Sequence, residues 1–138
     1  MIIIFISVFF AVGIIYTVCI IFFVRLSKQH FHILSVDEFE KRLTATKDAQ
    51  VIDVRTPREF KKYRVAGAKN IDMLGLGFRK KIKKLDTTKP VMVYCLSGYR
   101  SKMVLPKFRR AGFTTIYELN AGFSGWLKAG KSIERENN

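Results

Sequence analysis

The chain has 138 residues and a formal net charge of +14, from 25 Lys and Arg against 11 Asp and Glu. This length leaves room for one domain, or for one domain with an anchor. Its two cysteines are too few for a disulfide framework, and the lack of a C-x-x-C motif excludes a thioredoxin-like redox pair. The cysteines and the two histidines show no metal-ligand spacing, so we expect no metal site.

The first part of the chain differs sharply from the rest. Residues 1–24 are almost continuously apolar and carry no charged side chain. As a helix they would extend roughly 35 Å at about 1.5 Å per residue, enough to cross a hydrocarbon core of roughly 30 Å. A cleaved signal peptide would have a basic start and end in small residues, and a buried core helix is rarely apolar over such a length. We therefore predict a transmembrane anchor at 1–25, a juxtamembrane linker at 26–30, a domain at 31–130 and a polar tail at 131–138.

Charges next to the apolar run predict its orientation. Arg25 and Lys28 follow the run directly, whereas no basic side chain precedes it. Because positive flanks stay on the cytoplasmic side, we expect a single-pass protein of the cell membrane whose domain faces the cytoplasm. Cys19 lies inside the run, and we interpret it as a small packing or lipid-facing residue.

Beyond the anchor, strand-like and helix-like segments alternate. The expected strands are Phe31–Leu34, Val51–Val54, Lys69–Asp72, Val91–Tyr94 and Thr115–Tyr117. The expected helices are Val36–Leu43, a segment opened by Pro57, a basic segment with Phe78, Ile82 and Leu85 on one face, Ser101–Arg110 and Ser124–Lys128. This alternation is typical of an α/β domain with a largely parallel sheet.

Local signals mark several of these boundaries. Ser35 and Glu38 have capping-box spacing before the first helix of the domain, and Pro57 suits a first helical position. Pro106 lies inside an expected helix, where we predict a kink or a later helix start. The residues after Lys131 are polar and are expected to fray.

The segment Val91–Arg100 reads VMVYCLSGYR and contains the strongest chemical signal. A buried strand delivers Cys95 to its carboxyl end, the edge at which open α/β sheets bind ligands. Loop amides that curl around one point, together with the next helix N-terminus, would favour the nucleophilic thiolate. Gly98 allows the unusual backbone angles that such a loop needs. A buried, inert thiol is the alternative, but the polar and cationic neighbours favour a reactive one.

Four segments in order are similar to the signatures of the rhodanese family. Residues 95–101, CLSGYRS, resemble its C-x-x-G-x-R-S active loop, and residues 51–60 resemble its D-V-R-x-x-x-E-F signature. Residues 65–71 resemble the I-x-G-A-x-N-I element, and residues 119–126 resemble the closing G-G-x-x-x-W segment. Ala121 stands where the family usually has glycine.

The resemblance implies a rhodanese-like fold with a five-stranded parallel sheet flanked by helices. It implies that the Cys95 thiolate takes the outer sulfur of an anionic donor such as thiosulfate, and that a thiol or cyanide then removes it from the persulfide without any cofactor. The active-site loop would comprise Leu96, Ser97, Gly98, Tyr99 and Arg100. Supporting residues would be Asp53, Arg55 and Glu59, with Arg100 closing the loop and either Glu59 or Asp53 holding it.

Two other functions stay open at this point. One is a non-catalytic rhodanese-like module that binds a partner at the membrane, although the sequence indicates no particular protein partner. The other is a phosphatase or arsenate reductase of related fold, whose C-x5-R loop would be one residue longer. The basic run Arg79–Lys84 has three interpretations, in decreasing order of preference: a solvated helix face, a contact with anionic lipid and a nucleic-acid site. We expect no nucleic-acid partner.

Overall fold

The structure is a computed structural model that describes residues 13–21 and 30–136. Residues 13–21 form an exposed helix. Within the two described ranges, no helix combines the length and the apolar character needed to span a bilayer. Most of the predicted anchor (1–25) and of the predicted linker (26–30) lies outside the described residues.

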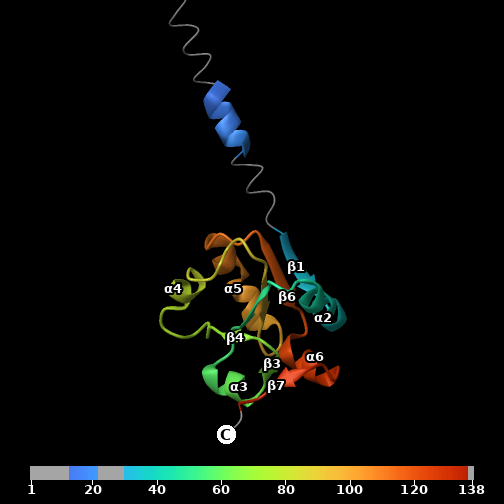
Figure 1. The fold of residues 1–138 in the computed structure, drawn as a ribbon. Coiled ribbons are helices and arrows are strands. Elements are labelled where there is room, and N and C mark those ends of the chain that lie inside the picture. The colour runs from blue at the N-terminus through green and yellow to red at the C-terminus, as the bar shows by residue number, and fades with distance from the viewer. Residues whose placement is uncertain (1–12, 22–29, 137–138) are drawn as a thin grey trace, which may run out of the picture.

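A parallel sheet lies at the centre of the domain, between β1 and β4 (Figure 1). It has five strands in the order β1-β6-β5-β2-β4. Its strands are β1 His30–Leu34, β2 Gln50–Asp53, β4 Lys69–Asn70, β5 Val91–Tyr94 and β6 Thr115–Leu119. Every neighbouring pair is parallel, which confirms the predicted five-stranded parallel sheet. In this register Val93 of β5 lies between Ile52 of β2 and Glu118 of β6.

Helices cover both faces of this sheet, as a parallel sheet with two apolar faces requires. They are α2 Val36–Ala45, α3 Pro57–Lys62, α4 Phe78–Ile82, α5 Tyr99–Arg110 and α6 Gly122–Lys128. One buried cluster lies under α4 and α5 and includes Phe78 and Phe108. The other lies under α2 and α6 and includes Phe39 and Trp126.

The helix starts follow from local chemistry. The capping box of Ser35 and Glu38 is present at α2. Thr56 and Glu59 form a second capping box at α3, and Pro57 begins that helix as predicted. Helix α5 begins at Tyr99 and continues through Pro106, which excludes the later start and leaves the kink as the remaining prediction for Pro106. Tertiary packing explains this continuity, because α5 buries Val104, Leu105 and Phe108 against the sheet.

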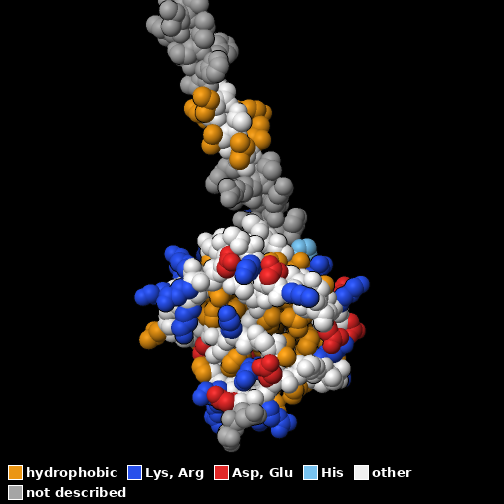
Figure 2. All heavy atoms as spheres, viewed as in Figure 1, with side chains coloured by type: hydrophobic (Ala, Val, Ile, Leu, Met, Phe, Trp, Pro, Cys, Tyr) orange, Lys and Arg blue, Asp and Glu red, His pale blue; other side chains and the backbone are white. Residues whose placement is uncertain are grey.

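Helix α4 carries most of the basic run noted in the sequence. Phe78 and Ile82 are buried, whereas Arg79, Lys80 and Lys81 between them are exposed. Figure 2 shows Lys and Arg side chains gathered over α4 at the left of the domain. The exposed side chains of Arg79, Lys80 and Lys81 are compatible with a solvated helix face and leave the lipid and nucleic-acid interpretations open.

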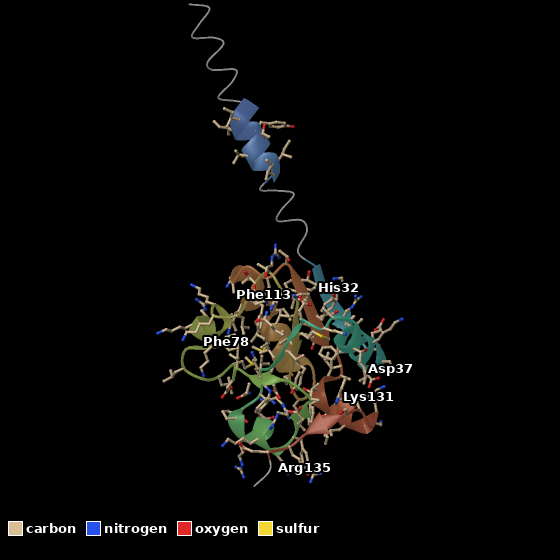
Figure 3. The ribbon with its side chains drawn as sticks, in the orientation of Figure 1. His32, Asp37, Phe78, Phe113, Lys131 and Arg135 are labelled. Carbon is tan, nitrogen blue, oxygen red and sulfur yellow. The ribbon has the colours of Figure 1, made fainter. Side chains whose placement is uncertain are left out.

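The predicted fraying after Lys131 is wrong for residues 132–136. Strand β7 (Ile133–Glu134) pairs antiparallel with β3 (Arg64–Val65), and the Glu136 amide donates to the Lys61 carbonyl at 3.2 Å. Ile133 packs against the cluster under α2 and α6, so the tail gains apolar burial that its polar composition does not indicate. Lys131 and Asp37 lie side by side (Figure 3) in a salt bridge of 2.8 Å.

Candidate active site

Cys95 is the first residue after β5 and is fully buried. Parallel strands place it at the carboxyl edge of the sheet, and the loop 96–98 leads from it into α5. The structure therefore confirms the predicted order of strand, cysteine, loop and helix. The side chains of Leu96, Ser97 and Tyr99 in this segment are exposed, whereas Cys95 is buried.

Backbone amides and carbonyls in and next to the Cys95 loop differ in their hydrogen bonding. In the part of the chain that the structure describes, the amides of residues 96–98 donate to no backbone carbonyl. The first amides of α5 also lack a partner within their own helix. The carbonyl of Cys95 accepts from the Phe123 amide at 2.7 Å, and that of Leu96 accepts from the Ser124 amide at 2.9 Å. The first turn of α6 thus holds the loop, whose amides remain available to an anion beside Cys95.

Two glycines permit the close approach of the loop to the turn before α6 and to the first residue of that helix. Gly98 has a φ of 84°, and a Cβ there would lie 2.0 Å from the carbonyl oxygen of Asn120. Gly122 has a φ of 59°, and a Cβ there would lie 2.5 Å from the carbonyl of Leu96. Ala121 has an ordinary φ of −83°, which explains why alanine is accepted at that position.

Arg100 fastens the end of the loop to α3. Its guanidinium donates to both carboxylate oxygens of Glu59, at 2.7 and 3.0 Å. This hydrogen bonding, helped by Thr56, lowers the pKa of Glu59 to about 2 despite its partial burial. Of the two carboxylates proposed to hold Arg100, the structure selects Glu59.

Asp53 pairs instead with Arg55. The two groups are buried, and Arg55 Nη2 lies 2.6 Å from Asp53 Oδ2 and 2.6 Å from the Tyr63 carbonyl oxygen. The guanidinium also lies over the Phe123 ring at 4.2 Å. Asp53 and Arg55 therefore lie beneath the site and support α6, which in turn holds the loop.

Two residues near the sulfur were not among the predicted site residues. Ser101 Oγ lies 3.4 Å from Cys95 Sγ and 2.6 Å from Glu118 Oε1. Glu118 is fully buried in β6. Its sequence signal is a carboxylate in the strand TIYEL, two residues after Ile116 and so on the same core-facing side of the strand.

The comparisons with known proteins agree with this geometry. The family model for the Rhodanese-like domain matches residues 35–129. The chain is 30% identical to thiosulfate sulfurtransferase GlpE of Shewanella oneidensis over 99 residues, which are 72% of this chain and 95% of that protein. It is 42% identical over 78 residues to the uncharacterized protein YqhL of Bacillus subtilis, covering 56% of this chain and 60% of that protein's length.

Solved structures share the fold. A rhodanese-related protein from Thermoplasma volcanium superposes with a TM-score of 0.65 at 24% identity, over 75% of this chain and 97% of that one. A rhodanese-like domain protein from Staphylococcus aureus also gives a TM-score of 0.65, at 22% identity, over 77% of this chain and 99% of that one. With its fold, its cysteine loop and the family match, the chain belongs to the rhodanese-like domain family.

Proposed function

We propose that this protein is a sulfurtransferase that carries sulfane sulfur as a persulfide on Cys95. The observation that carries the proposal is the placement of the buried Cys95 beside the unpaired amides of residues 96–98. Amides that face one point stabilise a thiolate and, after transfer, the negative charge of a persulfide. The similarity to a protein named thiosulfate sulfurtransferase supports thiosulfate as a donor.

The reaction is a covalent, two-step transfer. The Cys95 thiolate attacks the outer sulfur of thiosulfate, a new S–S bond forms, and the original S–S bond breaks as sulfite leaves with the electron pair. A thiolate or cyanide acceptor then attacks the outer sulfur of the persulfide, and the Cys95 thiolate is released. The sulfur is moved without any cofactor.

Arg100 and Glu59 act on this step by shaping the loop. The two-point contact between them fixes where the loop ends and α5 begins. Arg100 also adds positive charge near the point at which an anionic donor approaches. Because Cys95 has no exposed surface, a donor reaches the sulfur only when neighbouring groups move aside.

Mass spectrometry tests the proposal directly. The purified full chain is treated with thiosulfate and then digested, and we expect the peptide that contains Cys95 to gain one sulfur atom. Cys95→Ser should fold, gain no sulfur and show no thiosulfate:cyanide transfer, whereas Cys19→Ser should behave as the wild type. A folded wild-type chain whose Cys95 stays unmodified would instead support the non-catalytic binding module.

Loop length separates sulfur transfer from phosphate chemistry. Only four residues, Leu96 to Tyr99, separate Cys95 from Arg100. A loop of amides sets the radius of its own anion site, so this shorter ring suits a single sulfur and is too tight for a tetrahedral phosphate. We expect negligible hydrolysis of aryl phosphates. Efficient hydrolysis without sulfur uptake would favour the phosphatase alternative.

We also propose that residues 1–25 anchor the protein in the cell membrane with the domain in the cytoplasm. The support is the uncharged run 1–24 followed by Arg25 and Lys28. The chain enters the domain at the amino end of β1, whereas Cys95 lies at the carboxyl edge of the same parallel sheet. The active site would then face away from the anchor. Protease added to intact cells should spare residues 30–138, and their digestion would show the opposite topology.

A further inference from the structure

Glu118 is a buried carboxyl group that the proposed reaction does not use. It is fully buried in β6, with Val93 of β5 and Ile33 of β1 as its neighbours in the sheet. Among the described residues, its Oε2 atom has no hydrogen-bond partner. A buried carboxylate with one oxygen unpaired is costly, so this placement favours the neutral acid.

Within the described residues, the Glu118 side chain makes one hydrogen bond, to Ser101, which also lies next to the Cys95 sulfur. Ser101 Oγ lies between Glu118 Oε1, at 2.6 Å, and Cys95 Sγ, at 3.4 Å. The hydroxyl has a single proton and can donate it to only one of these neighbours. Both contacts are hydrogen bonds at once only when one of the outer groups donates to the Ser101 oxygen.

Two arrangements satisfy this condition, and they differ in where one proton lies. In the first, the Cys95 thiol donates to Ser101 and Ser101 donates to the Glu118 carboxylate. In the second, the Glu118 acid donates to Ser101 and Ser101 donates to the Cys95 thiolate. The unpaired Oε2 favours the second, because a neutral carboxyl loses less than a carboxylate when it is left without a partner.

The surroundings of Glu118 agree with this choice. Burial raises the pKa of Glu118, against the opposing effects of the Ser101 hydrogen bond and of the Lys102 charge. Lys102, on α5, is held at 2.6 Å by Asn120 Oδ1. The neighbours of Glu118 in the sheet, Val93 and Ile33, carry no charge.

We infer that Glu118 is a positioning residue: in its protonated form it turns the Ser101 hydroxyl toward the Cys95 sulfur, and in its ionised form it turns the hydroxyl away. This inference rests on the proposed sulfur transfer at Cys95. Ionised Glu118 opposes the thiolate twice, because it takes the hydroxyl proton for itself and places a second negative charge in the same buried space. Cys95 reactivity should therefore rise less steeply with pH than it would without this carboxyl group.

The test compares Glu118→Gln with the wild type in the full chain that carries Cys19→Ser. The glutamine amide can donate to Ser101 at every pH and never ionises, so it copies the protonated state. The matched control is Glu40→Gln, the same chemical change at a carboxylate of α2 that binds Lys131. The readouts are the rate of Cys95 alkylation by iodoacetamide and the rate of thiosulfate:cyanide transfer, each followed across pH.

We expect the alkylation rate of Glu118→Gln, relative to wild type, to stay near one in acid, where the wild-type carboxyl group is protonated. The ratio should rise, by about tenfold at most, over the pH range in which Glu118 is ionised and the thiol is not yet fully deprotonated. Glu40→Gln should follow the wild type throughout. A ratio for Glu118→Gln that does not change with pH would overturn the inference. If that variant does not fold, Ser101→Ala replaces it in the test. The Cys95 alkylation rate of Ser101→Ala should lie far below that of the wild type in acid and only slightly below it in alkali. An equal deficit at every pH would overturn the inference in the same way.

Alkylation needs no sulfur donor, so the two hypotheses fail separately. If the ratio of the two alkylation rates depends on pH but Cys95 accepts no sulfur, the role of Glu118 stands and the sulfurtransferase proposal fails. If Cys95 accepts sulfur but wild type and Glu118→Gln have the same alkylation rate at every pH, the sulfurtransferase proposal stands and the role of Glu118 fails.

Discussion

The domain contains two arginine–carboxylate pairs near the active site, and they differ in burial and in what they connect. Asp53 and Arg55 are two residues apart in sequence and expose 0% and 3% of their side chains. Glu59 and Arg100 are 41 residues apart and expose 29% and 26%. The first pair joins groups at the end of one strand, and the second joins α3 to the start of α5, directly after the Cys95 loop.

Because of this difference, we expect the buried pair to stabilise the fold and the part-exposed pair to support the proposed reaction. The buried pair contacts the Tyr63 carbonyl and the Phe123 ring, so its loss disturbs the packing beneath the site. The part-exposed pair lies at the border of the loop, where water can replace a lost partner. We therefore expect damage to the first pair to reduce stability, and damage to the second to reduce activity more than stability.

The largest stability effect is expected for Arg55→Ala. This change leaves Asp53 as an uncompensated buried charge, which typically costs about 3–5 kcal/mol. Urea unfolding followed by the fluorescence of Trp126, the single buried tryptophan, measures the effect. If the free energy of unfolding falls by less than about 1 kcal/mol, the value of an exposed ion pair, then burial does not make this pair more stabilising than a surface pair.

Glu59→Gln should have a smaller effect on stability and a clear effect on catalysis. The glutamine keeps the size of the side chain but loses the two-point, charge-assisted contact with Arg100, at a cost of about 1–2 kcal/mol. We expect sulfur transfer to fall about tenfold because the loop is no longer fixed at one end. Thiosulfate:cyanide kinetics measure the change, with Glu40→Gln as the matched control. Full activity in a stable Glu59→Gln protein would contradict the assigned role of the pair.

The contribution of Glu59 should also depend on pH. Its pKa is about 2 in the folded domain against an ordinary value of 4.5. A carboxyl group with a lowered folded pKa stabilises the fold above its unfolded pKa, and this stabilisation disappears as the pH falls through the folded pKa. The difference in unfolding free energy between wild type and Glu59→Gln should therefore shrink between about pH 4.5 and about pH 2. A difference that stays constant in this range would mean that ionisation of Glu59 is not its source.

The smallest effect is expected for Lys131→Ala. Lys131 bridges Asp37 and Glu40 on the surface, where Asp37 is 86% exposed. Such pairs contribute little, because solvent screens them and the long side chains lose freedom when they are held. Urea unfolding should detect no change beyond experimental error. A loss as large as that of Glu59→Gln would show that this bridge holds the C-terminal segment to α2.

Features fixed by neighbouring residues were predictable from the sequence. The capping box at Ser35, the start of α3 at Pro57 and the position of Cys95 between a buried strand and a helix all depend on residues a few positions apart, and the structure confirms each of them. The resemblance of four short motifs, in order, to the rhodanese family also implied the five-stranded parallel sheet that the structure contains.

Only the tertiary structure decided which distant groups meet. It selected Glu59 rather than Asp53 as the partner of Arg100, paired β7 with β3, and placed Glu118 against Ser101 beside the sulfur. These contacts join segments 17 to 70 residues apart. No local pattern encodes them, because they depend on how the sheet register and the packing of the helices bring separate segments of the chain together.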